Sequence, residues 1–103
     1  MKKYNLREIL AGMEEKPLNK EVFCITNHLK AQVTFLKAGN SIPSCKMEND
    51  VLFYFLTGEG TITVDDETNK IEPGDCVVVP DQAESRSIHA TTNLEFLAVQ
   101  GLK

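Results

Sequence analysis

The chain has 103 residues, 42% of them hydrophobic and 25% charged, which is the composition of one ordinary globular domain. Its formal net charge of -4 disfavours a nucleic-acid-binding function, because that function needs clustered Lys and Arg. The sequence has no apolar run long enough for a signal peptide or a membrane span, so we expect a cytoplasmic protein without a membrane partner. Its three cysteines are widely spaced and odd in number, which fits neither a disulfide framework nor a CxxC zinc site.

The first predicted element is a short helix near the N-terminus. Apolar residues recur there at helical spacing: Leu6, Ile9, Leu10 and Met13. Asn5 can cap the start of this helix, and Pro17 ends any helix that reaches it. We expect residues 1–19 to form a helix or arm that packs on the rest of the domain or on a second subunit.

From Glu21 onward the pattern changes to short strands separated by turn residues. The predicted strands are rich in β-branched, aromatic or other apolar residues and cover 22–25, 32–36, 51–56, 61–64, 76–79, 86–90 and 94–99. Turn residues such as Gly58-Glu-Gly60 and Pro73-Gly74-Asp75 separate them. No repeat or linker interrupts the series, so we expect one all-β domain over residues 1–103, with residues 20–103 forming a sandwich or barrel.

The spacing of glycines and prolines in two stretches carries a family resemblance. Eighteen residues separate Gly39 from Gly58, and Gly74 is followed after five residues by Pro80. These positions are similar to the two motifs of the cupin superfamily, which begin with Gly, five residues, His-x-His and with Gly, five residues, Pro. The resemblance implies a double-stranded β-helix, that is, a jelly-roll cupin barrel, with a pocket in one end.

The metal-binding residues of the family are not present on this scaffold. Metal cupins hold iron, manganese or a similar ion through two His and one Glu of the first motif and a His of the second. The first three positions correspond here to Cys45, Met47 and Val51, and the family spacing gives Ser85 for the fourth. Valine cannot coordinate a metal, and a thioether does not suit Mn²⁺ or Fe²⁺. We therefore expect neither a metal site nor another cofactor.

The family spacing and the alternation of side chains disagree about the second motif. Alternation places Ile88 and Ala90 inward, and it carries Arg86 with them, whereas the family spacing would turn Ser85 and His89 inward. An extra residue in the preceding loop would reconcile the two, and we favour Arg86. A guanidinium in the pocket would repel a divalent cation and would pair with a carboxylate or phosphate.

The expected pocket combines residues from both motifs: Cys45, Met47, Val51, Phe53, Ser85, Arg86 and His89. We expect Cys45 and Met47 to share one face of a strand and to fill the pocket apolarly. The alternatives are a soft Cu(I) site that adds His89, and a reactive thiol at Cys45. Glu48 and Asp50, near the pocket mouth, are alternative substitute ligands.

Surface positions complete the expectations. Tyr54 lies on the face opposite Phe53, where it can meet a second sheet or subunit, and the hairpin tip at Asp65, Asp66 and Glu67 is expected to be solvated. Because the barrel is small and the helix presents an apolar face, we expect a homodimer.

Three functions from different classes fit this sequence. The first is a small-molecule-binding cupin whose ligand is a small organic anion. The second is a cupin enzyme, either a metal-dependent oxygenase with rebuilt ligands or a metal-free sugar isomerase or epimerase, although we assign no catalytic residue. The third is a structural partner that uses the barrel faces for association. The loss of the metal ligands favours the first.

Overall fold

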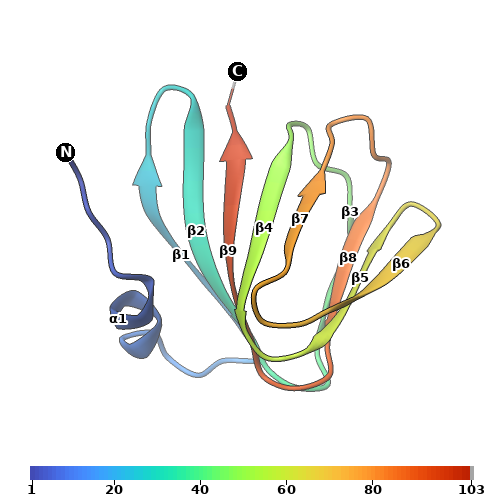
Figure 1. The fold of residues 1–103 in the computed structure, drawn as a ribbon, viewed down its shortest axis with the longest axis horizontal. Helices are drawn as coiled ribbons and strands as arrows, with labels where there is room; N and C mark the ends of the chain where they lie inside the picture. Colours follow the sequence, from blue (N-terminus) through green and yellow to red (C-terminus); the bar gives the residue numbers. More distant parts are fainter. Residues whose placement is uncertain (103) are drawn as a thin grey trace.

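The structure is a computed structural model that describes residues 1–102 (Figure 1). Within these residues the elements are, in chain order, α1 (Leu6–Ala11), β1 (Leu18–Ile25), β2 (Leu29–Leu36), β3 (Ser41–Cys45), β4 (Val51–Thr57), β5 (Gly60–Val64), β6 (Glu67–Ile71), β7 (Cys76–Val79), β8 (Arg86–Ala90) and β9 (Leu94–Gly101). The predicted strands 76–79 and 86–90 coincide with β7 and β8, because the first is an apolar run and the second alternates inward and outward residues, and turn residues bound both.

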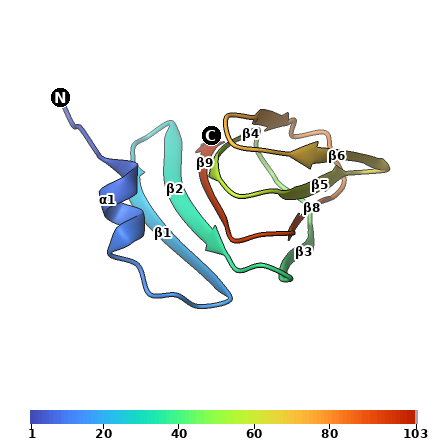
Figure 2. The ribbon, with the colours of Figure 1, turned by 60° about the horizontal axis from the view of Figure 1, so that its bottom comes forward.

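The strands form two antiparallel sheets with the core between them. The larger sheet has the order β1-β2-β9-β4-β7, and the smaller has the order β3-β8-β5-β6. Neighbours such as β2 and β9 are far apart in the sequence, which is the connectivity of a jelly roll. The expectation of an all-β double-stranded β-helix is confirmed. Figure 2 shows α1 beside β1 and β2, away from the smaller sheet.

Alternation along the central strands builds the core. In β4 the side chains of Val51, Phe53 and Phe55 are buried, whereas Leu52 and Tyr54 between them are exposed. The rings of Phe53 and Phe55 lie 5.8 Å and 5.2 Å, centroid to centroid, from the ring of Phe96 in β9. Such aromatic contacts add to the stabilisation that comes from burying apolar area.

The glycines of the turn between β4 and β5 are required by close backbone approach. Gly58 has a φ of +88°, in the region that side chains disfavour, and a Cβ there would overlap the carbonyl group of Asn93. A Cβ on Gly60 would overlap the carbonyl group of His89. This turn of the motif can therefore be made only with glycine at both positions.

The N-terminal helix begins as expected and ends early. The Asn5 side chain accepts a hydrogen bond from the backbone N–H of Glu8 at 3.0 Å, which confirms the predicted cap. The helix stops at Gly12, well before Pro17, and buries only Leu10. Among residues 1–102, no helix is long and apolar enough to cross a membrane.

Candidate ligand-binding site

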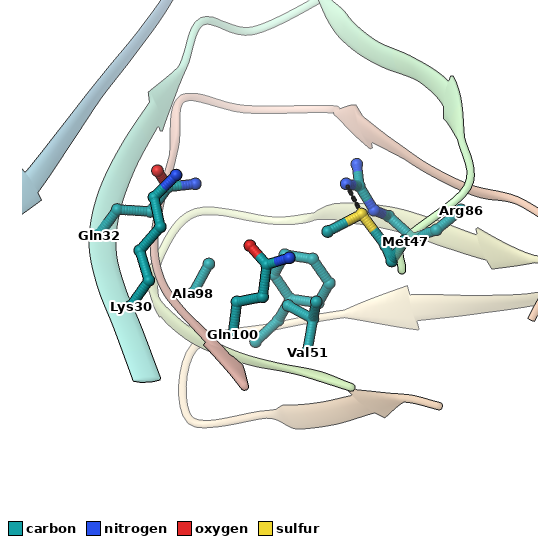
Figure 3. A pocket seen from close by; sticks show the side chains of 8 residues that line it. Lys30, Gln32, Met47, Val51, Arg86, Ala98 and Gln100 are labelled. Carbon is teal, nitrogen blue, oxygen red and sulfur yellow. Dashed lines mark hydrogen bonds between the residues drawn. The ribbon is translucent and has the colours of Figure 1, made fainter. Parts of the chain in front are cut away.

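A narrow cavity lies inside the barrel near one end (Figure 3). Its volume is about 30 Å³, which is room for one or two water molecules. The side chains that line it are Lys30 and Gln32 of β2, Met47 after β3, Val51 and Phe53 of β4, Arg86 of β8, and Ala98 and Gln100 of β9.

Strand register brings these residues to the same place. Ala98 is paired with both Gln32 and Phe53, and Gln100 is paired with both Lys30 and Val51. Because residues directly opposite each other in an antiparallel pair point to the same face, three strands of the larger sheet present their side chains together to the interior. Arg86 faces them from the smaller sheet.

Arg86 is the most unusual residue of the cavity. Only 7% of its surface is exposed, and its Nη2 donates a hydrogen bond to the Met47 Sδ at 3.0 Å. The centre of the guanidinium lies 5.3 Å from the centroid of the Phe53 ring, within the range of a cation–π contact. Its buried Nε has no hydrogen-bond partner among the described residues. Since a thioether is only a weak acceptor, the hydrogen-bonding capacity of the guanidinium is largely unused.

The charge of Arg86 also lacks a counterion among residues 1–102. Burial lowers the pKa of the guanidinium below its ordinary value, and the nearby Cys45 partly opposes this shift. An arginine nevertheless stays charged at neutral pH. Buried charges are normally paired, so this arrangement is suited to an anion that reaches the cavity from solvent.

The turn between β5 and β6 fixes the start of β8 and thereby the direction of Arg86. Asp65 has a φ of +54°, and its carboxylate accepts hydrogen bonds from the backbone N–H of Glu84 at 2.8 Å and of Ser85 at 3.0 Å. Its own N–H donates to the Ser85 carbonyl at 3.0 Å. Val64 then pairs with Arg86. The hairpin tip, expected to be only solvated, therefore also holds the loop that leads into β8.

The family of the chain follows from comparison with known proteins. The family model described as a cupin domain matches residues 31–100, which include the six strands from β3 to β8 in full and most of β2 and β9. The chain belongs to the cupin superfamily. No curated protein matches the chain.

Solved structures agree in fold with this cupin. A cupin superfamily protein from Desulfitobacterium hafniense has a TM-score of 0.84 at 18% identity, over 100% of this chain and 94% of that one. An RmlC-like cupin from Desulfovibrio desulfuricans has a TM-score of 0.83 at 23% identity, over 98% and 96%. The salicylate 1,2-dioxygenase of Pseudoaminobacter salicylatoxidans, crystallised with gentisate adducts, has a TM-score of 0.78 at 20% identity, over 92% and 30%. At these identities the likeness concerns the fold alone.

The cavity contains four of the seven residues that the sequence suggested for the cupin pocket. Met47, Val51, Phe53 and Arg86 line it. The choice between Ser85 and Arg86 is resolved in favour of Arg86, because alternation along β8 buries Arg86, Ile88 and Ala90 together.

The other three suggested residues lie outside the lining. Ser85 is half-buried before the start of β8. His89 is exposed, and its Nδ1 lies 2.6 Å from the Ser41 Oγ. Cys45 is exposed, and its thiol donates to the Lys46 carbonyl at 3.4 Å.

The expectation that Cys45 and Met47 share a strand face is wrong. The strand β3 ends at Cys45, so Met47 lies in the following loop. Pro43 has no N–H to give to the ladder, and the pairing of β3 with β8 shifts register between Ile42 and Cys45. The chain therefore leaves the sheet before Met47, which reaches the cavity from a loop instead.

The polar residues Lys30, Gln32 and Gln100 of the lining were missed, together with Ala98. The sequence of β2 did indicate two of them, because Lys30 and Gln32 lie on the same strand face as the buried Thr34 and Leu36. A polar residue at an inward position of an otherwise apolar strand indicates a cavity. Finding Gln100, however, requires knowing that β9 lies between β2 and β4.

The donor set at the usual metal position of a cupin does not fit a metal ion. Cys45 turns to the outside, Val51 has no donor atom, and the Met47 Sδ is held by the Arg86 guanidinium, whose positive charge opposes a divalent cation. Asp50, an expected substitute, accepts a hydrogen bond from the Asp81 backbone at 2.8 Å. Nowhere in residues 1–102 do three or more His, Cys, Asp or Glu gather as a cluster able to hold a metal.

Proposed function

We propose that this cupin binds a small organic anion, a carboxylate or a phosphate, inside its barrel. The observation that carries the proposal is the buried guanidinium of Arg86, whose partners are a thioether and an aromatic ring. An anion supplies the strong acceptors that a guanidinium otherwise lacks there, in the two-pronged geometry that arginine favours. The apolar Val51, Phe53 and Ala98 then contact the carbon skeleton of the ligand.

The cavity is too small for an organic anion unless the Met47 side chain moves. An organic anion needs more room than about 30 Å³, and Met47 is a half-buried side chain in a loop whose Sδ occupies the donor that the anion needs. A methionine side chain has three rotatable bonds and adapts readily. We expect the anion to displace the thioether and to take its place on the guanidinium.

The enzyme alternatives have less support in the cavity. The lining contains no His, Tyr, Asp or Glu. The metal-free epimerases of the superfamily use a His base and a Tyr acid, and acid–base chemistry needs both groups near one point.

Carboxylate binding has a precedent in the fold. The salicylate dioxygenase was crystallised with gentisate adducts, so the fold accommodates aromatic carboxylates elsewhere in the superfamily. The cytoplasmic location expected from the sequence stays a prediction.

A thermal-shift screen tests the anion proposal. A ligand at about a hundred times its dissociation constant stabilises the fold by about 2.7 kcal/mol, which corresponds to a shift of several degrees for a domain of about 100 residues. We expect small carboxylates and phosphates to raise the Tm, and neutral sugars and amines to leave it unchanged. Arg86→Ala should remove the shift.

The matched control is Arg7→Ala, which removes the same charge from the exposed face of α1 and should keep the shift. A screen with no preference for anions, or a preference that survives Arg86→Ala, would exclude Arg86 as the anchor.

A further inference from the structure

The wall of the cavity opposite Arg86 is polar and positively charged. In Figure 3, Lys30 and Gln32 lie across the cavity from Arg86 and Met47, and Gln100 lies between the two sides. Within residues 1–102, the side chains of Lys30, Gln32 and Gln100 take part in no hydrogen bond or ion pair. The lining therefore has hydrogen-bond donors on both sides of the cavity, and between the two sides lie the Gln100 amide and the apolar side chains of Val51, Phe53 and Ala98.

The charge balance of the cavity is opposite to that of the whole protein. The chain carries 15 acidic and 11 basic residues, yet the lining holds two basic side chains and no acidic one. A ligand with one anionic group satisfies Arg86 and leaves the other end of the cavity unmatched. A ligand with an anionic group at each end matches both.

We propose that the ligand is a short dianion, with a carboxylate-like group at each end of a small apolar chain. One end pairs with Arg86, and the other accepts hydrogen bonds from Lys30 and from the amide of Gln32, while the amide of Gln100 lies between the two ends (Figure 3). The apolar side chains of Val51, Phe53 and Ala98 contact the short carbon chain that joins the two anionic groups. This inference rests on the proposed function, because it names the class of anion that the same site selects.

Calorimetric titration with paired probes tests the inference. Succinate and butyrate share a four-carbon chain, glutarate and valerate share a five-carbon chain, and within each pair only the number of carboxylates differs. We expect the better dicarboxylate to bind about tenfold more tightly than its monocarboxylate partner, which is the effect of one additional charge-assisted contact. Lys30→Met should lower the affinity for the dicarboxylate about tenfold more than the affinity for the monocarboxylate, and so abolish this difference.

The control is Lys70→Met, which removes one positive charge from an exposed position on β6 and should keep the tenfold difference. Equal affinities for the two members of each pair, or a difference that survives Lys30→Met, would overturn the dianion inference but leave the anion site standing. If none of the four probes binds the wild-type protein, the anion site itself is wrong, and this inference fails with it.

Discussion

At the scale of single residues, Arg86 combines a structural cost with the binding role proposed for it. Its Nε is buried without an acceptor among the described residues, and an unsatisfied buried donor costs about 1–3 kcal/mol. Replacing buried ionic groups by apolar side chains of similar size is often neutral or stabilising. A buried group that costs stability and lines a cavity is typical of a functional site.

We therefore expect Arg86→Met to raise the stability of the ligand-free protein. The free energy of unfolding, measured by urea denaturation, should increase by about 1 kcal/mol, and the response of the Tm to organic anions should disappear. Arg7→Met, on the exposed helix, serves as the control and should change neither quantity appreciably. A marked loss of stability in Arg86→Met would show that the guanidinium has a mainly structural role.

At the scale of elements, the strands were predictable wherever burial alternated or an apolar run ended at a turn. The sequence predicted β7 and β8 with their observed bounds, and alternation in β8 indicated that Arg86 points inward. The segment around Cys45 was not predictable in this way, because a proline and a register shift end β3 there.

The composition of the cavity wall was also beyond local patterns. Gln100 lies between Lys30 and Val51 because β9 pairs with β2 on one side and with β4 on the other, and this order results from the folding of distant segments. Local propensity carries no information about which strands become neighbours. The resemblance to the superfamily indicated the position of the pocket and the residues at the usual ligand positions, but not the polar side chains of the opposite wall.

The turn between β5 and β6 gives a prediction at this scale. Asp65→Ala removes the acceptor for the N–H groups of Glu84 and Ser85 and places alanine at a positive φ. We expect a loss of about 1–2 kcal/mol in the free energy of unfolding and a weaker response to anions, because the start of β8 is no longer held.

Asp65→Asn is the matched variant for this turn, since it keeps an acceptor oxygen and tolerates a positive φ. It should retain most of the stability and most of the anion response. If Asp65→Ala behaves like the wild type in urea denaturation, then the turn does not position β8.

At the scale of the whole molecule, the outer face of the larger sheet presents two rows of uncharged residues. The register pairs Val99, Leu52 and Val78 in one row, and Leu97, Tyr54 and Cys76 in the other. Leu52, Tyr54 and Val78 are exposed, Val78 to 62%. Contiguous exposed apolar surface commonly marks an interface.

We propose that a second copy of the chain covers this face. The protein has a net charge of -4, and an uncharged patch lets two acidic copies meet without placing like charges against each other. A twofold interface uses the same patch on both subunits. Light scattering at micromolar concentration should therefore give the mass of two chains.

Val78→Lys places a charge in this face and should give a folded monomer, as judged by circular dichroism. Thr68→Lys, at an exposed position on β6, is the control and should remain dimeric. A monomeric mass for the wild type would contradict the proposed dimer.

The most direct test of the central claim, that Arg86 binds the anion, is the NMR signal of its Nε–H. The chain has only two arginines, Arg7 and Arg86, so Arg86→Lys assigns both signals, and the exposed Arg7 is an internal control. Titration with glutarate at constant ionic strength should shift the Arg86 signal until it saturates and should leave the Arg7 signal in place. An Arg86 signal that does not move, or that moves no more than the Arg7 signal, would contradict the account.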